Sequence, residues 1–527
     1  MIEVTTIRIG LLTSVLICLA ACAPEANMEE ERFDVLIING QVYDGTLEPG
    51  RLTNLAIIDE RIVSVDAPVD APADLIIDAN NQIVVPGFID PHTHVLDDIL
   101  SPERHSVASH LTQAVTTVFV GNDGGGLPDR STMVQTMQAQ GVGTNVGYFA
   151  GHNQIRESVM GLEDRPPTPG ELANMQDLVA AEMQAGALGL STGLFYKPGS
   201  YATTEEVIEL AKTAARFGGI YDSHIRDESS YNIGLVGSVR EVIRIGREAD
   251  IPAHIAHIKA LGRDVWGQSG DLIALIDSAR EAGLRVTADQ YPWQASGTRF
   301  GAALIPRWAM ADSNEAMFAR LANPDLQDQI REEIESNIAR RGGADSMLVT
   351  GVSEWRGMTL DEIAERLEIE PVDAAIEVVR GGDPSIASFN MKIDDIGALA
   401  IQPWVMTGSD GGEGHPRKYA SYPKAYREFV VDQSILTIEQ WVHRSSGLVA
   451  DTFALCDRGY LRQGRKADIA IIDLATYEPQ ADFENPSRLA TGVTNVLVNG
   501  KLAIGERELQ QVMSGQVIDR QNLNCEQ

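Results

Sequence analysis

Predicted strands alternate with amphipathic helices from Val84 to about Leu455, and this alternation constrains the fold more than any other feature of the 527-residue sequence. Because parallel strands need long crossover connections, usually helices, the pattern predicts a parallel sheet. Eight predicted strands end near Asp90, Asn122, His152, Ser191, His224, His257, Tyr291 and Asp410. A closed (β/α)8 barrel requires eight such strands, so we predict an α/β, TIM-like barrel over residues 86–455.

The connection between the seventh and eighth predicted strands is unusually long. Residues 299–400 contain helical patterns of their own, such as 359–367 and 372–380. Active sites of such barrels lie at the carboxyl ends of the strands, where this connection begins. We therefore interpret it as an insert that covers or shapes the pocket, and a decoration that only adds solubility is the alternative.

The two ends of the chain share a different pattern, one of short alternating strands. Residues 33–85 and 456–527 both contain an Asn-Gly pair typical of a hairpin turn, Asn39-Gly40 in the first and Asn499-Gly500 in the second. This shared pattern predicts one small β domain built from both chain ends, with the barrel between them in the sequence.

The first 21 residues have the pattern of a bacterial lipoprotein signal peptide. An apolar run over residues 9–21 ends in Leu19-Ala20-Ala21-Cys22, which resembles a lipobox with Cys22 as the acylated residue. The run is too short to span a bilayer as a permanent helix. We therefore expect a signal peptide over 1–21, a tether over 22–32 and a lipid anchor to the membrane. Ala23, by resemblance to lipoprotein sorting signals, favours the outer membrane facing the periplasm.

Acidic residues outnumber basic ones by 75 to 42, which gives a formal charge of −33. Such a surplus repels phosphate backbones, so nucleic acid is excluded as an electrostatic partner. With 44% apolar and 22% charged residues, the chain has the composition of a folded protein suited to small-molecule chemistry. The four cysteines are too few and too scattered for a disulfide framework or a thiolate zinc site. The oligomeric state stays open.

Histidines and an aspartate follow several of the predicted strands. His92 and His94 are two residues apart at the end of the first strand, so both imidazoles point to the same face. His224 and His257 end the fifth and sixth strands, and Asp410 ends the eighth. Because these strand ends meet at one end of a barrel, the residues predict a site for a divalent metal.

The other histidines have plainer expectations. His254 lies three residues before His257 and points to the other face of its strand, so we expect it to pack there. His105, His110 and His443 fall on predicted helices and are expected at the surface.

The residues around these positions resemble the amidohydrolase superfamily, and within it the N-acyl-D-amino-acid deacylases, called D-aminoacylases. The resemblance covers nearly all of the chain after the signal peptide. It rests on several motifs in a fixed order, namely Gly87-Phe88-Ile89-Asp90-Pro91-His92-Thr93-His94, Ala187-Leu188-Gly189-Leu190-Ser191-Thr192-Gly193, His224-Ile225-Arg226-Asp227-Glu228, His257-Ile258-Lys259, Asp289-Gln290-Tyr291-Pro292 and Gly408-Ser409-Asp410-Gly411.

This resemblance implies a role for each candidate residue in hydrolysing the amide bond of N-acyl-D-amino acids. Zinc would be held tightly by His224 and His257, and a second, weaker position by His92 and His94. Asp410 would be the general acid and base for a water that the metal activates. The substrate carboxylate would meet Lys259, Tyr291 and Arg417. His152 would contact the substrate carbonyl or the second metal position.

The sequence departs from the family at the end of the second strand. The family has a zinc-binding cysteine within Gly-Asn-Cys-Gly, and this chain has Gly121-Asn122-Asp123-Gly124. A carboxylate keeps the negative charge but is a harder ligand than a thiolate. We expect Asp123 to remain a ligand, in a site that is less selective for zinc and more tolerant of manganese or cobalt.

Two other functions fit the same residues. The substrate of the metal site could be another cyclic amide, a dipeptide or a lactone. Alternatively, the barrel could be a catalytically inactive, lipid-tethered binding protein. A general acid and base such as Asp410 argues against the inactive form.

Overall fold

The structure is a computed structural model that describes residues 32–126 and 130–520, together with Met1 and Leu523. The predicted signal peptide and all of the predicted tether except Arg32 lie outside the described residues. Among the helices of the described part, none is long and apolar enough to cross a membrane.

Parallel strands form the centre of the molecule, in a sheet of three strands and a sheet of six. They are β6 (Phe88–Asp90), β7 (Val115–Val120), β8 (Asn145–Tyr148), β9 (Ala150–Gly151), β10 (Gly189–Gly193), β11 (Ile220–His224), β12 (Ala253–Ile255), β13 (Val286–Gln290) and β17 (Val405–Thr407). The third predicted strand is divided at Phe149, so that β8 pairs with β7 and β9 pairs with β10. Counted as one, these two complete the eight strands of the predicted barrel, and each ends within three residues of its predicted end.

The first and last barrel strands meet through the segments that follow them. The amide of Asp410 donates to the carbonyl of His92 at 2.9 Å, and the amide of His94 donates to the carbonyl of Gly411 at 3.0 Å. A parallel bridge joins Thr93 to Gly411. Closure of the barrel therefore places the first predicted histidine pair beside the predicted acid and base.

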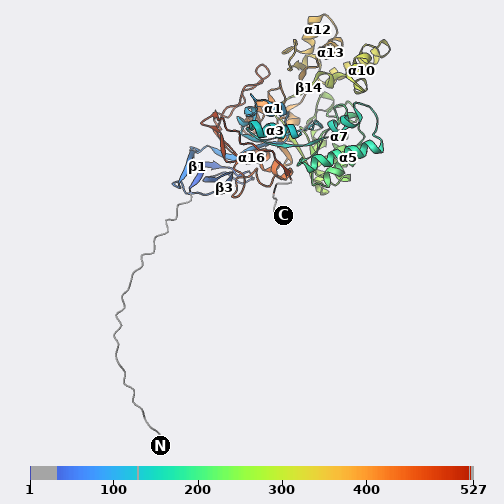
Figure 1. The fold of residues 1–527 in the computed structure, drawn as a ribbon. Coiled ribbons are helices and arrows are strands. Elements are labelled where there is room, and N and C mark those ends of the chain that lie inside the picture. The colour runs from blue at the N-terminus through green and yellow to red at the C-terminus, as the bar shows by residue number, and fades with distance from the viewer. Residues whose placement is uncertain (2–31, 127–129, 521–522, 524–527) are drawn as a thin grey trace.

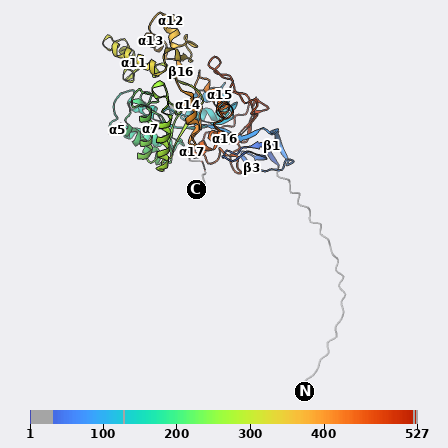
Figure 2. The same cartoon turned by 180° about the vertical axis from the view of Figure 1, so that it is seen from behind.

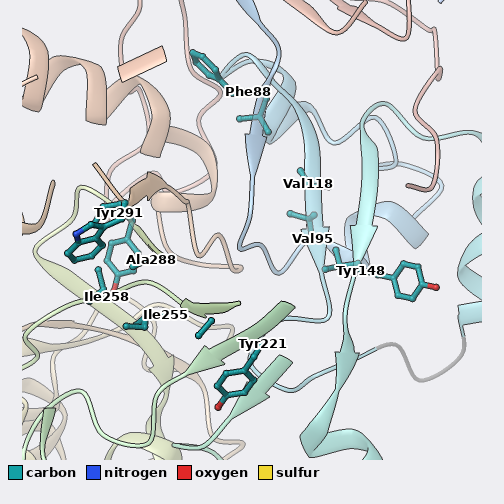
Figure 3. Packing of buried hydrophobic residues seen from close by; sticks show 14 of the residues in the cluster. Phe88, Val95, Val118, Tyr148, Tyr221, Ile255, Ile258, Ala288 and Tyr291 are labelled. Carbon is teal, nitrogen blue, oxygen red and sulfur yellow. The ribbon is translucent and has the colours of Figure 1, made fainter. Parts of the chain in front are cut away.

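Helices surround the barrel strands. They are α1 (Leu96–Leu100), α2 (Ala108–Leu111), α3 (Arg130–Gln140), α4 (His152–Met160), α5 (Pro169–Gln184), α6 (Thr204–Ala215), α7 (Leu235–Glu248), α8 (Ser269–Glu281), α14 (Ile393–Ala400), α15 (Arg417–Ala425), α16 (Ile438–Ser445) and α17 (Gly447–Thr452). A large apolar cluster packs these helices on the strands. Members of the cluster that are labelled in Figure 3 are Phe88, Val95, Val118, Tyr148, Tyr221, Ile255, Ile258, Ala288 and Tyr291. A second apolar cluster contains Ile89, Phe119 and Ile220, which are adjacent in the strands to Phe88, Val118 and Tyr221 of the first cluster. Successive side chains of a strand point to opposite faces, so neighbouring residues belong to different clusters.

Both chain ends contribute to one nine-stranded sheet, as predicted. Its strands are β1 (Phe33–Val42), β2 (Arg51–Ile58), β3 (Arg61–Ser64), β4 (Ala73–Asp78), β5 (Ile83–Pro86), β18 (Ile469–Ile472), β19 (Val493–Val498), β20 (Lys501–Gly505) and β21 (Glu508–Leu509). The two ends join where β5 pairs with β18. Asn499-Gly500 forms the predicted turn between β19 and β20.

The hairpin turn predicted at Asn39-Gly40 is wrong. Both residues lie inside β1, where the pairing with β2 shifts register between Ile37 and Gly40. Asn39 has a left-handed φ of 56°, and a Cβ on Gly40 would lie 2.5 Å from Cγ2 of Val84. The pair therefore forms a β-bulge, which lets β1 lie close to Val84, instead of the hairpin turn that Asn-Gly pairs often form.

The predicted insert is a separate lobe, and Figures 1 and 2 show it on the opposite side of the barrel from β1 and β3. It contains β14 (Ala295–Arg299), α9 (Phe300–Leu304), α10 (Asn314–Leu321), α11 (Gln327–Arg340), β15 (Met347–Val349), α12 (Leu360–Leu367), α13 (Pro371–Arg380) and β16 (Ser385–Phe389). Its own apolar core runs from Phe300 to Ile386. The predicted limit near residue 400 is too late, because Ile396 and Leu399 of α14 belong to the barrel core. A parallel crossover from β13 to β17 needs a helix, and α14 supplies it.

Candidate metal centre and active site

The predicted metal ligands come from four different strands and meet at one end of the barrel. His92 and His94 follow β6, Asp123 follows β7, His224 is the last residue of β11 and His257 follows β12. All of these strands are parallel neighbours in the two sheets, so their carboxyl ends lie together.

One oxygen of Asp123 lies at the centre of the histidines. Its Oδ1 is 3.4 Å from Nε2 of His92, 3.4 Å from Nε2 of His257 and 3.5 Å from Nδ1 of His224. Its second oxygen, Oδ2, is 3.5 Å from Nε2 of His94. Asp123 therefore faces both predicted metal positions at once.

These separations fit a divalent metal better than they fit direct hydrogen bonds. Four ligand atoms about 2.0–2.1 Å from a tetrahedral zinc ion lie about 3.3 Å from one another. Both ring nitrogens of His92 and of His224 are buried and have no hydrogen-bond partner in the described part of the chain. Because buried polar atoms are normally satisfied, the two of these nitrogens that face Asp123, Nε2 of His92 and Nδ1 of His224, fit the binding of a metal ion between them.

Three residues of the site have an uncommon backbone conformation. Asp123, His257 and Asp410 have φ values of 55°, 34° and 47°. Aspartate and histidine both adopt the left-handed region more readily than most residues other than glycine. Each conformation occurs two or three residues beyond a strand end, in the segment that brings the side chain into the site.

Asp410 lies beside both histidines of the first strand and is held by an arginine. Its Oδ1 is 3.2 Å from Nε2 of His94 and 3.7 Å from Nε2 of His92, and its Oδ2 is 2.8 Å from Nη1 of Arg417. Burial alone raises the pKa of Asp410, but Arg417 and then His257 bring that pKa well below its ordinary value. Asp410 is therefore a carboxylate at neutral pH, as a general base must be.

A cavity of about 490 Å³ opens above this cluster. His94, Asp123, Asp410 and Arg417 form its floor, together with His415 and Tyr196. The insert supplies one wall, made of Thr298, Arg299, Ala302, Thr350, Ser385 and Ile386. The insert thus shapes the pocket, as we interpreted it from the sequence, and is not a decoration that only adds solubility.

The predicted carboxylate-binding residues lie together beside the cavity. Arg417 is centred 4.9 Å from the Tyr291 ring, and Nζ of Lys259 is 5.4 Å from it. The buried Nε of Arg417 and the hydroxyl of Tyr291 have no hydrogen-bond partner among the described residues. Lys259 differs, because its Nζ already contacts Oε1 of Glu228 at 2.5 Å and Nδ1 of His257 at 2.7 Å.

Glu228 is a site residue that the sequence analysis did not single out. Its Oε1 is 3.0 Å from Nδ1 of His257, and its Oε2 is 3.9 Å from Nε2 of His224. Burial alone raises the pKa of Glu228, but Lys259 and the two imidazoles lower that pKa well below its ordinary value. Glu228 therefore presents a carboxylate to the ring nitrogens that face away from Asp123, as the outer partners of metal-bound histidines do.

Replacing Glu228 by glutamine is expected to weaken metal binding by about 10- to 100-fold, the usual effect of losing an outer partner of a ligand. The amide keeps the size of the side chain but not the charge that orients His257. Competition with a chelator of known affinity measures the change. Glu248→Gln, which removes a half-exposed carboxylate paired with Arg244 on α7, is the control and leaves the affinity unchanged. Equal affinity in both variants would show that Glu228 does not orient the ligands.

The structure places His152 away from the cavity. It is the first residue of α4 and is fully buried, with Nε2 3.0 Å from Oε1 of Glu206. The same oxygen accepts from Nε of the fully buried Arg156 at 3.2 Å. The ion pair holds Nε2 only, since the buried Nδ1 of His152 has no hydrogen-bond partner among the described residues, and the contact of His152 with substrate or metal stays a prediction.

Glu206→Leu is expected to lower the free energy of unfolding by about 3–5 kcal/mol, because Arg156 then keeps its charge without a carboxylate inside the protein. Urea denaturation followed by tryptophan fluorescence measures the loss. Glu209→Leu on the same helix is the matched control, since Glu209 pairs with Lys212 and its side chain is 42% exposed. The two variants unfolding at the same urea concentration would contradict a stabilising role for Glu206.

The remaining histidines were expected either to pack in the interior, for His254, or to lie at the surface, for His105, His110 and His443. His254 is fully buried and bonds Thr287 and Asp289 on the neighbouring strand, as expected for a packing residue. His110 is also fully buried, with Nε2 3.5 Å from Oδ2 of Asp90, so its expected surface position is wrong. The short helix α2 places it against the first strand. His105 and His443 are partly buried.

Comparison with known proteins agrees with this geometry. The amidohydrolase family profile matches residues 75–504. The D-aminoacylase of Alcaligenes xylosoxydans xylosoxydans is 30% identical over 519 residues, which cover 93% of this chain and 99% of that protein.

Two solved structures have the same fold over their whole length. N-acyl-D-glutamate deacylase from Bordetella bronchiseptica, complexed with zinc and a phosphonate that mimics the tetrahedral intermediate, superimposes with a TM-score of 0.80 at 30% identity. A D-aminoacylase described as having a binuclear metal center superimposes with a TM-score of 0.79 at 29% identity. Each match covers 93% of this chain and 100% of the other. The chain therefore belongs to the amidohydrolase family, in the group that contains the D-aminoacylases.

Proposed function

We propose that this protein hydrolyses the amide bond of N-acyl-D-amino acids and releases a carboxylate and a free D-amino acid. The observation that supports this most strongly is the cluster of imidazoles around Asp123, with Asp410 beside it on the floor of a cavity of about 490 Å³. The D preference rests on the named relatives, a D-aminoacylase and an N-acyl-D-glutamate deacylase.

In this function, His224, His257 and Asp123 would hold the metal, with His92 and His94 at a second position. A divalent metal there would supply Lewis-acid chemistry for the scissile carbonyl and for the attacking water. Asp410 accepts the proton of the attacking water and returns it to the leaving nitrogen. Arg417, 2.8 Å from Oδ2, keeps Asp410 ionised and orients it for that transfer.

Arg417 and Tyr291 bind the substrate carboxylate in this proposal. Both have a buried donor without a partner, and both lie beside the floor of the cavity. Lys259 adds positive charge next to the ring of Tyr291. The ammonium group of Lys259 also donates a hydrogen bond to Glu228. Arg417 and Lys259 thus place positive charge where an anionic substrate must bind in this strongly negative chain.

We infer that zinc is the resident metal and that manganese or cobalt can replace it. The imidazoles of His224 and His257 with the carboxylate of Asp123 suit zinc, and the absence of a thiolate lowers the preference for it over harder ions. Burial alone raises the pKa of Asp123, but His92 and His224 bring that pKa well below its ordinary value, so the ligand is charged.

We also propose that the protein is a lipoprotein of the outer membrane that faces the periplasm. The lipobox at Cys22 supports this, and so does Cys456, which is disulfide-bonded, because disulfides persist in oxidising compartments such as the periplasm. Labelling with radioactive palmitate tests the anchor. Incorporation that is lost in Cys22→Ala is expected, and equal labelling of both proteins would contradict it.

The substrate class is tested with metal-loaded protein and a panel of compounds. The proposal predicts hydrolysis of N-acetyl-D-amino acids. Hydrolysis of cyclic amides, dipeptides or lactones with N-acetyl-D-amino acids left intact would assign the metal site to another substrate.

A further inference from the structure

A second cavity, of about 400 Å³, lies where the insert meets the barrel. Its lining does not overlap with that of the catalytic cavity. The barrel contributes segments after β10 and β11, including Phe195 and Tyr231, and the insert contributes residues from Ile305 to Arg340. The volume is within the range of small-molecule sites, which is about 300–1,000 Å³.

Arginines without carboxylate partners surround this second cavity. Among the described residues, Arg307 donates to the backbone carbonyls of Phe195 and Ala302, at 2.8 and 2.7 Å, and more weakly to the carbonyl of Ile305 and the sulfur of Met310. Arg340 donates to the amide oxygen of Asn337 at 2.7 Å.

Behind these two, Arg341 is 2% exposed and donates to the hydroxyls of Tyr231 and Ser296. Among the described residues, no ion pair joins any of the three arginines to a carboxylate.

The fourth arginine at the cavity, Arg226, differs from these three because it is paired with Glu241 at 2.9 Å. Buried charges are normally paired, because removing them from water is costly. Burial also lowers the pKa of the Arg307 guanidinium.

The rest of the wall is largely apolar and aromatic. Leu194, Phe195, Tyr231, Ile305, Pro306 and Trp308 line the cavity. Glu333, the one carboxylate in the lining, accepts from the indole of Trp308 at 3.1 and 3.2 Å. A ligand for this cavity therefore needs an anionic group for the arginines and an apolar group for the other wall.

We propose that the second cavity binds a small amphipathic carboxylate, with its charged group on Arg307 and Arg340 and its apolar group against Phe195 and Trp308. Free acids released by amide hydrolysis and intact N-acyl amino acids both have this chemistry. The site also borders the metal centre, because the Phe195 ring stacks on Arg307 at 4.1 Å and packs on the metal-facing His224, with ring centroids 5.7 Å apart. The proposal does not depend on which amide the enzyme cleaves.

Calorimetric titration of metal-loaded Asp410→Asn protein tests this, since that variant is not expected to consume its ligand. Hexanoate and N-acetyl-D-leucine are the two probes, and they separate the free acid from the acylated amino acid as the source. The expected result is a binding event for one probe or both that Arg340→Gln weakens at least tenfold. Arg331→Gln on the same helix, where Arg331 pairs with Asp373 instead, is the control and leaves that event unchanged.

Arg417 lines the catalytic cavity, so a binding event that is weakened by Arg417→Gln takes place in that cavity and not in the second one. Binding of both probes that depends on Arg417 and is unaffected by Arg340→Gln would overturn the proposal while leaving the proposed function intact. Inorganic phosphate is a third probe. Phosphate has a charge but no apolar group. If phosphate at the same concentration displaces hexanoate from the site that depends on Arg340, the apolar wall adds nothing to the affinity, and the proposal of an amphipathic ligand is wrong.

Discussion

Asp410→Asn is expected to lower kcat/KM by about 10²- to 10⁴-fold while metal content stays the same, because proton transfer by a positioned carboxylate contributes about that factor. Asparagine is nearly isosteric with aspartate and tolerates the left-handed φ of 47° at this position, so the fold is expected to be unaffected. The amide cannot accept the proton of the attacking water. Steady-state kinetics together with metal analysis of the same sample measure both quantities.

A matched control separates this effect from a general loss of negative charge. Asp177→Asn on the exposed face of α5 makes the same chemical change far from the cavity and is expected to keep the parent rate. Undiminished activity of Asp410→Asn would show that another group moves the proton. Loss of metal in Asp410→Asn would show instead that Asp410 acts mainly as a ligand.

Asp123→Ala is expected to weaken metal binding by more than about 100-fold, the upper end of the effect of changing an outer partner. Between them, the two oxygens of Asp123 face all four histidines, at 3.4 to 3.5 Å. Removing it leaves the imidazoles without the negative charge between them. Equilibrium dialysis against zinc, manganese and cobalt measures the affinities.

The backbone at Asp123 requires a second variant. Its φ of 55° is left-handed, so alanine adds strain that aspartate largely avoids. Asp123→Gly removes the carboxylate without that strain. If Ala and Gly weaken metal binding equally, the carboxylate is responsible, and normal metal affinity in Asp123→Gly would exclude it as a ligand.

Asp123→Cys restores the thiolate that the family pattern has at this position. A softer ligand is expected to raise the preference for zinc over manganese, because thiolates select zinc and carboxylates suit manganese. An unchanged ratio of the two affinities would show that residue 123 does not set the choice of metal.

Strand ends and ligand types could be predicted from the sequence because both follow short-range rules. A hydrophobic strand stops where polar residues begin, so His224 and Asp410 could be placed at strand ends without knowing the packing. Asp123 was identified by its place in the family pattern at the end of the second strand, and its role as a ligand stays a prediction.

Contacts between distant segments were not accessible in this way. Glu228 could be suspected only from its position four residues after His224, and its carboxylate reaches the imidazole of His257 only because β11 and β12 are neighbours. His152 has the same sequence context as a ligand, but Glu206 of another helix holds it. These outcomes depend on which residues the fold brings together.

Local signals were also ambiguous where packing decides between two conformations. Asn499-Gly500 makes a hairpin turn, whereas Asn39-Gly40 makes a bulge inside β1, because Val84 of the adjoining β5 requires a residue without a Cβ. The insert ends before α14 because the barrel needs that helix for its last crossover. Periodicity identifies a helix but does not assign it to one of two cores.

The central claim is that this metal centre cleaves N-acyl-D-amino acids, and one measurement tests it most directly. Protein of measured metal content is given the D and L enantiomers of the same N-acetyl amino acid, and release of the free amino acid is followed. We predict release from the D enantiomer that is abolished by chelation and restored by zinc. Release from the L enantiomer alone, or release that is independent of metal, would contradict the claim.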